Sequence, residues 1–367
     1  MMSVDRRLII AGILGLAGCV VAAWLDVHAL MLGWLCVAAT LSGIAVGAMA
    51  VLMLTYLVRG PWTEGLHAPL VATSMTIPAV AVLFVPVLVG VPWLYPWVGK
   101  GVVDPGSFKA IYLTPWFFIA RTVFYFGVWT VLSWWTRAAW GSPRRMVASA
   151  AAGLIIYALT ASFAGIDWLE TLTPEFHSSL YGLLVLTFQL LAGYAFVLVI
   201  GLSRRRAETD SYGATLLAVL LLWAYNHAMQ YIIVWSGNLP RETVWYEARE
   251  HGVWGAVLWT LIFLQFILPF FALLTGKVRN ARRPLLVIAS ATVGLRLVEA
   301  CVLALPETAG GRAVILLAVP ASLLLAGALW LGAFAGLYRR VLVSAHDRQT
   351  LENDFDAAGS PLPSSRP

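Results

Sequence analysis

The stretch that decides the fold is residues 29–58, ALMLGWLCVAATLSGIAVGAMAVLMLTYLV, which contains no charged side chain. A membrane-spanning helix needs roughly 20 apolar residues to cross about 30 Å of hydrocarbon, and this run is longer. It is continuously apolar, without the alternation of a transmembrane β-strand, and therefore predicts a helix. Gly43 and Gly47 form a Gly-x-x-x-Gly pattern within it, a spacing typical of a helix-packing face.

The rest of the chain repeats this pattern. Of its 367 residues only 11% are charged, whereas a soluble domain carries about 25%. The sequence therefore predicts an all-α polytopic integral membrane protein, with a transmembrane domain over residues 1–345. A polar cytoplasmic tail, residues 346–367, is rich in Ser and Pro and is predicted to be disordered. The ten predicted transmembrane helices are 8–25, 29–58, 70–94, 111–135, 146–166, 178–202, 213–236, 252–275, 284–304 and 313–338.

The distribution of Lys and Arg predicts the orientation of these helices. The odd-numbered connections between the helices contain only Lys100, Lys109, Arg241, Arg249 and Arg312. The termini and even-numbered connections contain many more, namely Arg6, Arg7, Arg59, Arg137, Arg144, Arg145, Arg204, Arg205, Arg206, Lys277, Arg279, Arg282, Arg283, Arg339 and Arg340. The positive-inside rule then places both termini in the cytoplasm. Because this bias is an orientation signal, nucleic-acid binding is not expected.

The three cysteines, Cys19, Cys36 and Cys301, all lie in apolar runs. The chain has no Cys-x-x-Cys and no Cys-x-x-Cys-His, so structural disulfides, a metal centre, iron–sulfur ligation and covalently attached haem are not expected. Residues 16–19, LAGC, resemble a bacterial lipoprotein cleavage box. The apolar run continues to Trp24, which favours an uncleaved first helix.

Charged side chains within the predicted helices are few, and each costs at least about 2.5 kcal/mol on insertion scales. At ~1.5 Å per residue, Arg296 and Glu299 lie about 20–24 Å from the inner end of their helix, and His227 lies about 20 Å along its own. Four uncharged polar residues also lie within the predicted helices, namely Gln189, Asn226, Gln230 and Gln265. The candidates for a proton pathway or an outer-side ligand site are Arg121, Asp167, His177, His227, Arg296 and Glu299.

Each of these signals also has a structural interpretation. Arg296 and Glu299 are three residues apart and can neutralise each other. His227 can serve as a polar contact between helices, and Asp167 can be an ordinary helix-end residue. The functional interpretation is that carboxylates and a histidine at a shared outer depth accept and release protons.

A short internal repeat is visible in the same residues. Asp167 lies seven residues before Pro174-Glu175, and Glu299 lies seven residues before Pro306-Glu307. Both acids lie at the end of an inside-to-outside helix, the fifth and the ninth. Chance is one explanation, and the other is a pair of parallel four-helix units over about 29–166 and 178–304.

Several long stretches resemble a known family. They are residues 82–97 (VLFVPVLVGVPWLYPW), 109–129 (KAIYLTPWFFIARTVFYFGVW), 166–196 (IDWLETLTPEFHSSLYGLLVLTFQLLAGYAF), 220–249 (LLLWAYNHAMQYIIVWSGNLPRETVWYEAR) and 268–274 (LPFFALL). Over residues of about 40 to 305 the chain resembles membrane subunits of the bacterial alternative complex III. The nearest type is the ActF-type quinol:cytochrome c oxidoreductase subunit, which is related to NrfD-like polysulfide-reductase subunits.

The resemblance implies two four-helix bundles flanked by one helix at each end, in the bacterial inner (plasma) membrane. It implies a role in quinol oxidation and proton movement, with quinone or quinol as the candidate cofactor and none bound covalently. The implied partners are a multihaem cytochrome c, an iron–sulfur protein and a larger paralogue that holds the main quinol site. The stretches 57–67 (LVRGPWTEGLH) and 245–249 (WYEAR) depart from the family pattern.

Two other functions remain open at the level of sequence. Ten helices, a repeat and intramembrane charges also suit a secondary transporter, although Pro78, Pro86 and Pro269 do not break helices at matching positions. A purely structural membrane anchor, which holds the catalytic paralogue in place, has the same sequence features as a proton-conducting subunit.

Overall fold

The structure is a computed structural model that describes residues 2–58, 60, 65–99, 106–203, 211–306 and 312–359, with side chains omitted at 2–4, 312–313 and 345–359. Within these residues there is no β-strand, and ten helical runs are long and apolar enough to cross a membrane. This confirms the all-α polytopic fold. Arg59, Lys100, Arg204 to Arg206 and Glu307, which the sequence analysis used, lie outside the described residues.

Most predicted helices begin and end within a few residues of those observed. The first half contains α1 (Met2–Leu25), α2 (Val27–Leu57), α3 (His67–Ser74), α4 (Ile77–Leu83), α5 (Val85–Val89), α6 (Val91–Leu94), α7 (Phe108–Tyr112), α8 (Pro115–Ala138), α9 (Pro143–Trp168) and the short η2 (Glu170–Leu172). The second half contains α10 (Tyr181–Leu202), α11 (Tyr212–Gly237), α12 (Pro240–Glu250), α13 (Gly252–Ile262), the π-helical η3 (Phe263–Ile267), α14 (Leu268–Leu274), α15 (Gly276–Arg279), α16 (Arg282–Ala304) and α17 (Arg312–Gly359).

Local chemistry sets many of these boundaries. Asp26 separates α1 from α2, and its carboxylate accepts a hydrogen bond from the Ala29 amide at 3.1 Å, which caps α2. Pro115 and Pro143 occupy the first positions of α8 and α9, where a missing N–H costs nothing. Asn238, with φ of 45°, ends α11 in the left-handed conformation.

Two spans are interrupted. The third predicted helix is divided into α3, α4, α5 and α6, and the last three of these begin with a proline at their first or second position. Proline lacks the N–H that the preceding turn needs, so each one breaks the hydrogen-bond ladder. The eighth predicted helix consists of α13, the π-turn η3 and α14, with Pro269 just after that turn.

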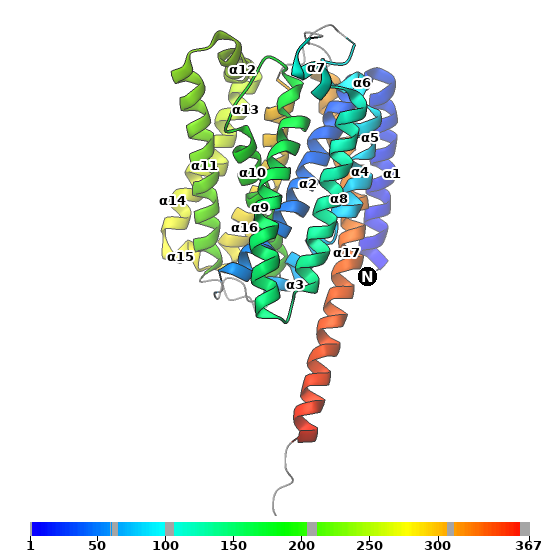
Figure 1. Cartoon of the computed structure of the whole chain (residues 1–367), viewed down its shortest axis with the longest axis vertical. Helices are drawn as coiled ribbons and strands as arrows, with labels where there is room; N and C mark the ends of the chain where they lie inside the picture. Colours follow the sequence, from blue (N-terminus) through cyan, green and yellow to red (C-terminus); the bar gives the residue numbers. More distant parts are fainter. Residues whose placement is uncertain are drawn as a thin grey trace, which may run out of the picture.

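The helices form two groups. The first contains α2, the α3–α6 run, α8 and α9, and the second contains α10, α11, the α13–α14 run and α16. The central helices α2 and α10 pack along each other and join the two groups. Helices α1 and α17 pack together beside the first group, on the right of Figure 1. This arrangement agrees with two four-helix bundles and one additional helix at each end of the sequence.

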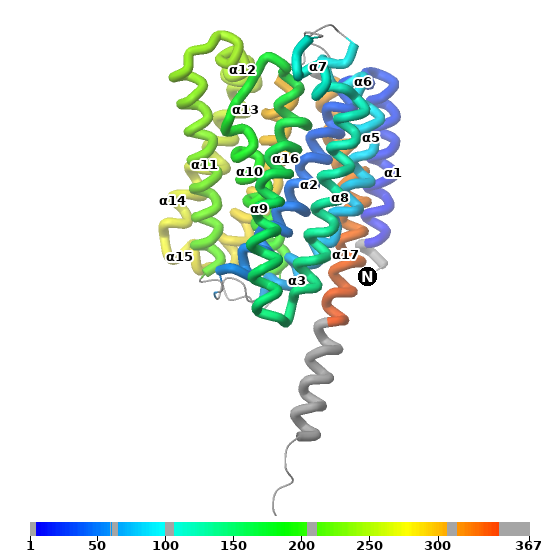
Figure 2. The backbone as a smooth tube through the Cα atoms, viewed as in Figure 1, coloured from blue at the N-terminus to red at the C-terminus, as the bar shows by residue number. Residues whose placement is uncertain are grey.

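Both ends of the described chain lie at the same end of the bundle, as Figure 2 shows. The cytoplasmic location of this end stays a prediction from the positive-inside rule. Helix α17 continues to Gly359. The disorder of the tail from residue 346 stays a prediction. Helix α1 continues without a break through residues 16–19, the LAGC stretch, and the side chain of Cys19 is buried.

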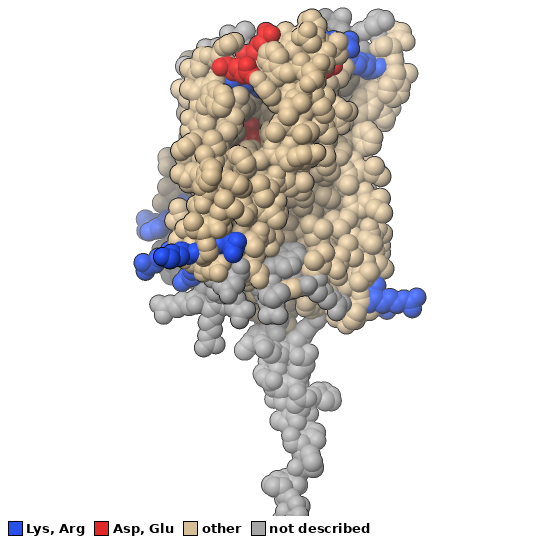
Figure 3. Space-filling model, turned by 90° about the vertical axis from the view of Figure 1, so that its left-hand side faces the viewer, with Lys and Arg blue, Asp and Glu red and all other residues tan. Residues whose placement is uncertain are grey.

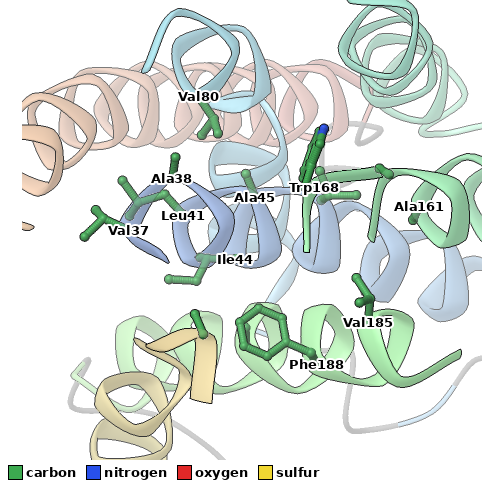
Figure 4. Packing of buried hydrophobic residues seen from close by; sticks show 14 of the residues in the cluster. Val37, Ala38, Leu41, Ile44, Ala45, Val80, Ala161, Trp168, Val185 and Phe188 are labelled. Atoms are coloured by element: carbon green, nitrogen blue, oxygen red, sulfur yellow. The ribbon is translucent and has the colours of Figure 1, made fainter. Parts of the chain in front are cut away.

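The closest helix contact is between α2 and α10. A Cβ atom placed on Gly47 would lie 1.7 Å from the carbonyl oxygen of Gln189, and one on Gly193 would lie 2.2 Å from the amide nitrogen of Ala48. Gly43 faces the ring of Phe188. This confirms that the Gly43–Gly47 pair is a helix-packing face. Figure 4 shows α2 side chains such as Leu41 and Ile44 enclosed by neighbouring helices.

We expect Gly47→Ala to destabilise the chain, because the new methyl group overlaps backbone that cannot move aside. Overpacking of this kind costs about 1–3 kcal/mol, which thermal unfolding of the purified chain in detergent can measure. Gly127→Ala is the matched control, since Gly127 is an exposed residue of α8 with nothing within 4 Å of the added Cβ. Equal unfolding midpoints for Gly47→Ala and Gly127→Ala would contradict this assignment of the contact.

Candidate functional site

The six candidate residues occupy three separate places. Arg121 on α8 faces Asp167 on α9 in the first bundle. His177 lies in the connection between η2 and α10. His227 on α11 meets Glu299 and Arg296 of α16 in the second bundle. The structure therefore separates the candidates into one pair, one triad and the single residue His177, rather than gathering them in one continuous layer.

The Arg121–Asp167 pair is closed. Arg121 donates to both carboxylate oxygens of Asp167, through Nε at 2.8 Å and Nη2 at 2.9 Å. The Tyr125 hydroxyl donates to the same carboxylate at 2.8 Å. The third guanidinium donor, Nη1, bonds the Tyr112 carbonyl at 2.9 Å, and the guanidinium lies 3.8 Å from the Tyr112 ring centre.

This geometry favours a structural role for Asp167. Its side chain is fully buried and both of its oxygens accept hydrogen bonds. A bidentate arginine–carboxylate pair is among the strongest side-chain interactions. A neighbouring hydrogen bond also connects α9 to α8, because Trp168 Nε1 donates to the Thr122 hydroxyl at 3.1 Å. The pair therefore ties α8 to the end of α9.

His177 belongs to a second cluster at the end of the bundle where α7 and α12 lie. Lys109 Nζ contacts His177 Nε2 at 2.6 Å and also bonds the Pro174 carbonyl at 3.3 Å. Glu170 lies on the other side, with its Oε1 atom 3.7 Å from His177 Nδ1. Burial, followed by the positive charges of Lys109 and Arg241, lowers the pKa of His177 below its ordinary value of 6.5. The ring therefore accepts a hydrogen bond from Lys109 as a neutral group.

The triad in the second bundle is built around Glu299, whose side chain is 1% exposed. Its Oε1 atom lies 2.9 Å from His227 Nε2 and accepts a hydrogen bond from Trp223 Nε1 at 3.0 Å. Its Oε2 atom pairs with Nη1 of Arg296, one turn earlier on the same helix. The carboxylate therefore joins α16 to two successive turns of α11.

Arg296 is buried completely but has few polar contacts. Its guanidinium lies 4.9 Å from the Trp223 ring centre and 5.6 Å from that of Phe188, within the range of a cation–π interaction. Its Nε and Nη2 groups have no hydrogen-bond partner among the described residues. Such groups are rare in folded proteins.

A cavity of about 530 Å³ lies beside this triad, between α11, α12, α13 and α16. Its walls include both Glu299 and His227, whose side chain is 30% exposed. Much of the remaining lining is apolar, including Leu184, Leu258, Leu261, Ile262 and Phe266. Tyr231 and Trp259 also line the cavity and are exposed on the outside of the bundle, so it borders the lipid-facing surface. Figure 3 shows this face, with acidic atoms recessed in a hollow.

Arg249 contributes to the cavity and was not predicted as a site residue. It is 2% exposed, and it donates to the carbonyls of Val302 and Leu303 at 2.9 Å each and of Trp245 at 2.6 Å. The first two carbonyls belong to the last turn of α16, where helix carbonyls lack partners of their own. No sequence pattern shows this role, since the partners of Arg249 on α16 are backbone carbonyls more than fifty residues away.

Comparison with known proteins adds no identification, because no family model and no curated protein matches the chain. Among the described residues, no group of three or more His, Cys, Asp or Glu is arranged to hold a metal ion. The geometry of the cavity is therefore the basis for a functional proposal.

We expect Asp167→Asn to lower the stability of the chain without lowering activity per assembled molecule. The substitution leaves the Arg121 charge buried without a counter-ion, and breaking such a pair costs roughly 3–5 kcal/mol. Thermal unfolding in detergent measures this loss, with exposed Glu175→Gln as the control. A normal unfolding midpoint combined with impaired proton release would contradict the structural role.

The His177 cluster should loosen in acid. A histidine whose pKa is lower in the folded than in the unfolded chain stabilises the fold fully above its unfolded pKa of 6.5, and this contribution is lost as the pH falls through that value. Hydrogen exchange of residues 173–180, corrected for intrinsic rates, should be faster at about pH 5.5 than at about pH 7.5. His177→Gln should abolish the difference, and a persistent difference in that variant would exclude His177 as its source.

Proposed function

We propose that this chain is a membrane subunit of a quinol:cytochrome c oxidoreductase of the alternative complex III type, and that its cavity binds quinol. The observation that carries the proposal is the position of the His227–Glu299 pair in the wall of a largely apolar cavity that borders the lipid-facing surface. A lipid-soluble ring compound with ionisable hydroxyl groups fits such a site. The proposed location is the bacterial inner membrane, with both termini in the cytoplasm.

The geometry supports a specific route for the first proton. When Nε2 of His227 donates to Oε1 of Glu299 at 2.9 Å, Nδ1 of the ring is free to accept a proton. A quinol hydroxyl hydrogen-bonded to Nδ1 loses its proton to the imidazole as an electron leaves for an iron–sulfur or haem centre of a partner subunit. The resulting imidazolium is stabilised by the carboxylate that orients it, as in other histidine–carboxylate pairs.

The same cavity offers a route for proton release. Glu250 and His251 line it where α12 ends and α13 begins, outside the membrane-spanning segments. Tyr231 and Tyr246 also line the cavity, and their rings are in edge-to-face contact 5.2 Å apart. Protons from His227 therefore have titratable groups between the cavity and the outer end of the bundle. The iron–sulfur protein and the multihaem cytochrome would supply the redox centres, beside the paralogous quinol subunit.

The proposed function distributes the six candidate residues over different tasks. His227 accepts the proton, Glu299 orients and stabilises the protonated ring, and Arg296 pairs with the buried carboxylate of Glu299. Arg121, Asp167 and His177 maintain the packing of the first bundle and its outer connection. A purely structural anchor would have no need for a carboxylate–histidine pair beside an open cavity.

A secondary transporter receives less support from the helix interruptions. The interrupted runs are the third and the eighth spans, five positions apart, whereas the internal repeat relates helices that are four apart. Transporters of repeated architecture place broken helices at corresponding positions around the substrate. Here the two interruptions do not correspond.

We expect His227→Gln in the assembled complex to reduce quinol-driven cytochrome reduction by about 100-fold or more, because glutamine keeps a hydrogen bond to Glu299 but cannot accept a proton. This variant leaves the Arg296–Glu299 pair intact, so the complex should assemble. Exposed Glu247→Gln on α12 is the control and should leave turnover unchanged. Wild-type turnover by assembled His227→Gln complex would refute the proposed function of this cavity.

A further inference from the structure

Gln230 is a polar residue of the cavity wall that the protein itself does not satisfy. It lies on α11, is 0% exposed and lines the cavity. The Tyr246 phenol lies beside it, but neither the amide nitrogen nor the amide oxygen of Gln230 has a hydrogen bond of normal geometry with any described group. A buried amide in this condition is destabilising and needs an explanation.

The position of Gln230 relative to His227 is fixed by the helix. Residues three apart on an α-helix lie on one face, with Cβ atoms about 5–6 Å apart. His227 and Gln230 both line the cavity, so they present two polar groups along the same wall at different heights. A ligand with two oxygen atoms on one ring can contact both at once.

The other strong donors near this wall are already used. Arg249 bonds the carbonyls of Val302 and Leu303, and Trp223 Nε1 bonds Glu299. The amide of Gln230 is also chemically different from these groups, because it offers both a donor and an acceptor. A carboxylate would offer only acceptors, and an arginine only donors.

We propose that Gln230 positions the ring of the ligand by binding the oxygen that does not face His227. Its NH₂ group donates to this oxygen when it is a carbonyl, and its C=O group accepts from it when it is a hydroxyl. Gln230 would therefore hold the oxidised and the reduced ring in the same place. This inference rests on the proposed quinol-binding function and assigns Gln230 as a positioning residue within that site.

Gln230→Leu separates binding from stability. Replacing an unsatisfied buried amide by an apolar side chain of similar size removes a desolvation cost, so we expect the ligand-free variant to unfold at an equal or higher temperature than wild type. The same substitution should weaken ligand binding. Gln265→Leu is the matched control, because Gln265 is also fully buried with an unsatisfied oxygen but does not line the cavity.

The direct experiment measures binding of decylubiquinone and decylubiquinol to the full chain in lipid nanodiscs, by quenching of tryptophan fluorescence. We expect Gln230→Leu to weaken both forms by about tenfold, the value of one hydrogen bond. Gln230→Glu should weaken the quinone more than the quinol, because an ionised carboxylate cannot donate to a carbonyl. Gln265→Leu should bind both forms as wild type does.

The outcomes separate the two proposals. Wild-type affinity of Gln230→Leu for both forms, or an unchanged ratio of the two affinities in Gln230→Glu, would overturn the role of Gln230. The cavity would remain the binding site if Ala228→Trp, which fills it, still abolished binding. A wild-type chain that binds neither form, or whose binding survives Ala228→Trp, would overturn the proposed function together with this inference.

Discussion

Close packing of α2 against α10 is the constraint on which the rest of the structure depends. Within lipid, burial of apolar surface gives little drive for helices to associate, so association relies on dense contact. Gly47 and Gly193 provide it, because each lies where any side chain would overlap the backbone of the opposite helix. Since α2 belongs to the first bundle and α10 to the second, this contact fixes the two bundles relative to each other.

The two buried acid–base clusters show how similar sequence features lead to different properties. Asp167 accepts hydrogen bonds from Arg121 and Tyr125 through both oxygens, and its side chain is fully buried. Glu299 has a comparable set of partners, but one of them, His227, is partly exposed in a cavity. The two clusters differ in whether a molecule in the cavity can reach them, rather than in their charge. A pair that is closed on all sides stabilises, and a pair open on one side can exchange a proton.

The sequence predicted much of the fold because membrane helices follow from length and hydropathy alone. The ten spans and the Gly43–Gly47 packing face are of this kind, since each depends on residues close in the sequence. The site was harder to predict. His227 and Glu299 were selected as costly charges in apolar runs, but their contact joins helices seventy residues apart. Arg249 was taken only as a loop cation, and its buried role depends on the carbonyls at the end of α16.

Incomplete hydrogen bonding is concentrated around the second bundle's polar residues, and this supports a ligand site there. Asn226, Gln230 and Gln265 each have an unsatisfied amide oxygen, and Arg296 has unsatisfied guanidinium groups. A bundle selected only for stability would replace such groups with apolar side chains, because each unsatisfied group is destabilising. Of these residues Gln230 lines the cavity, and the other three belong to the same bundle outside its lining. Retained polar groups of this kind are expected where binding or catalysis requires polarity that the fold itself does not need. The unsatisfied polar groups between α11 and α16 are therefore consistent with the proposed function of the cavity.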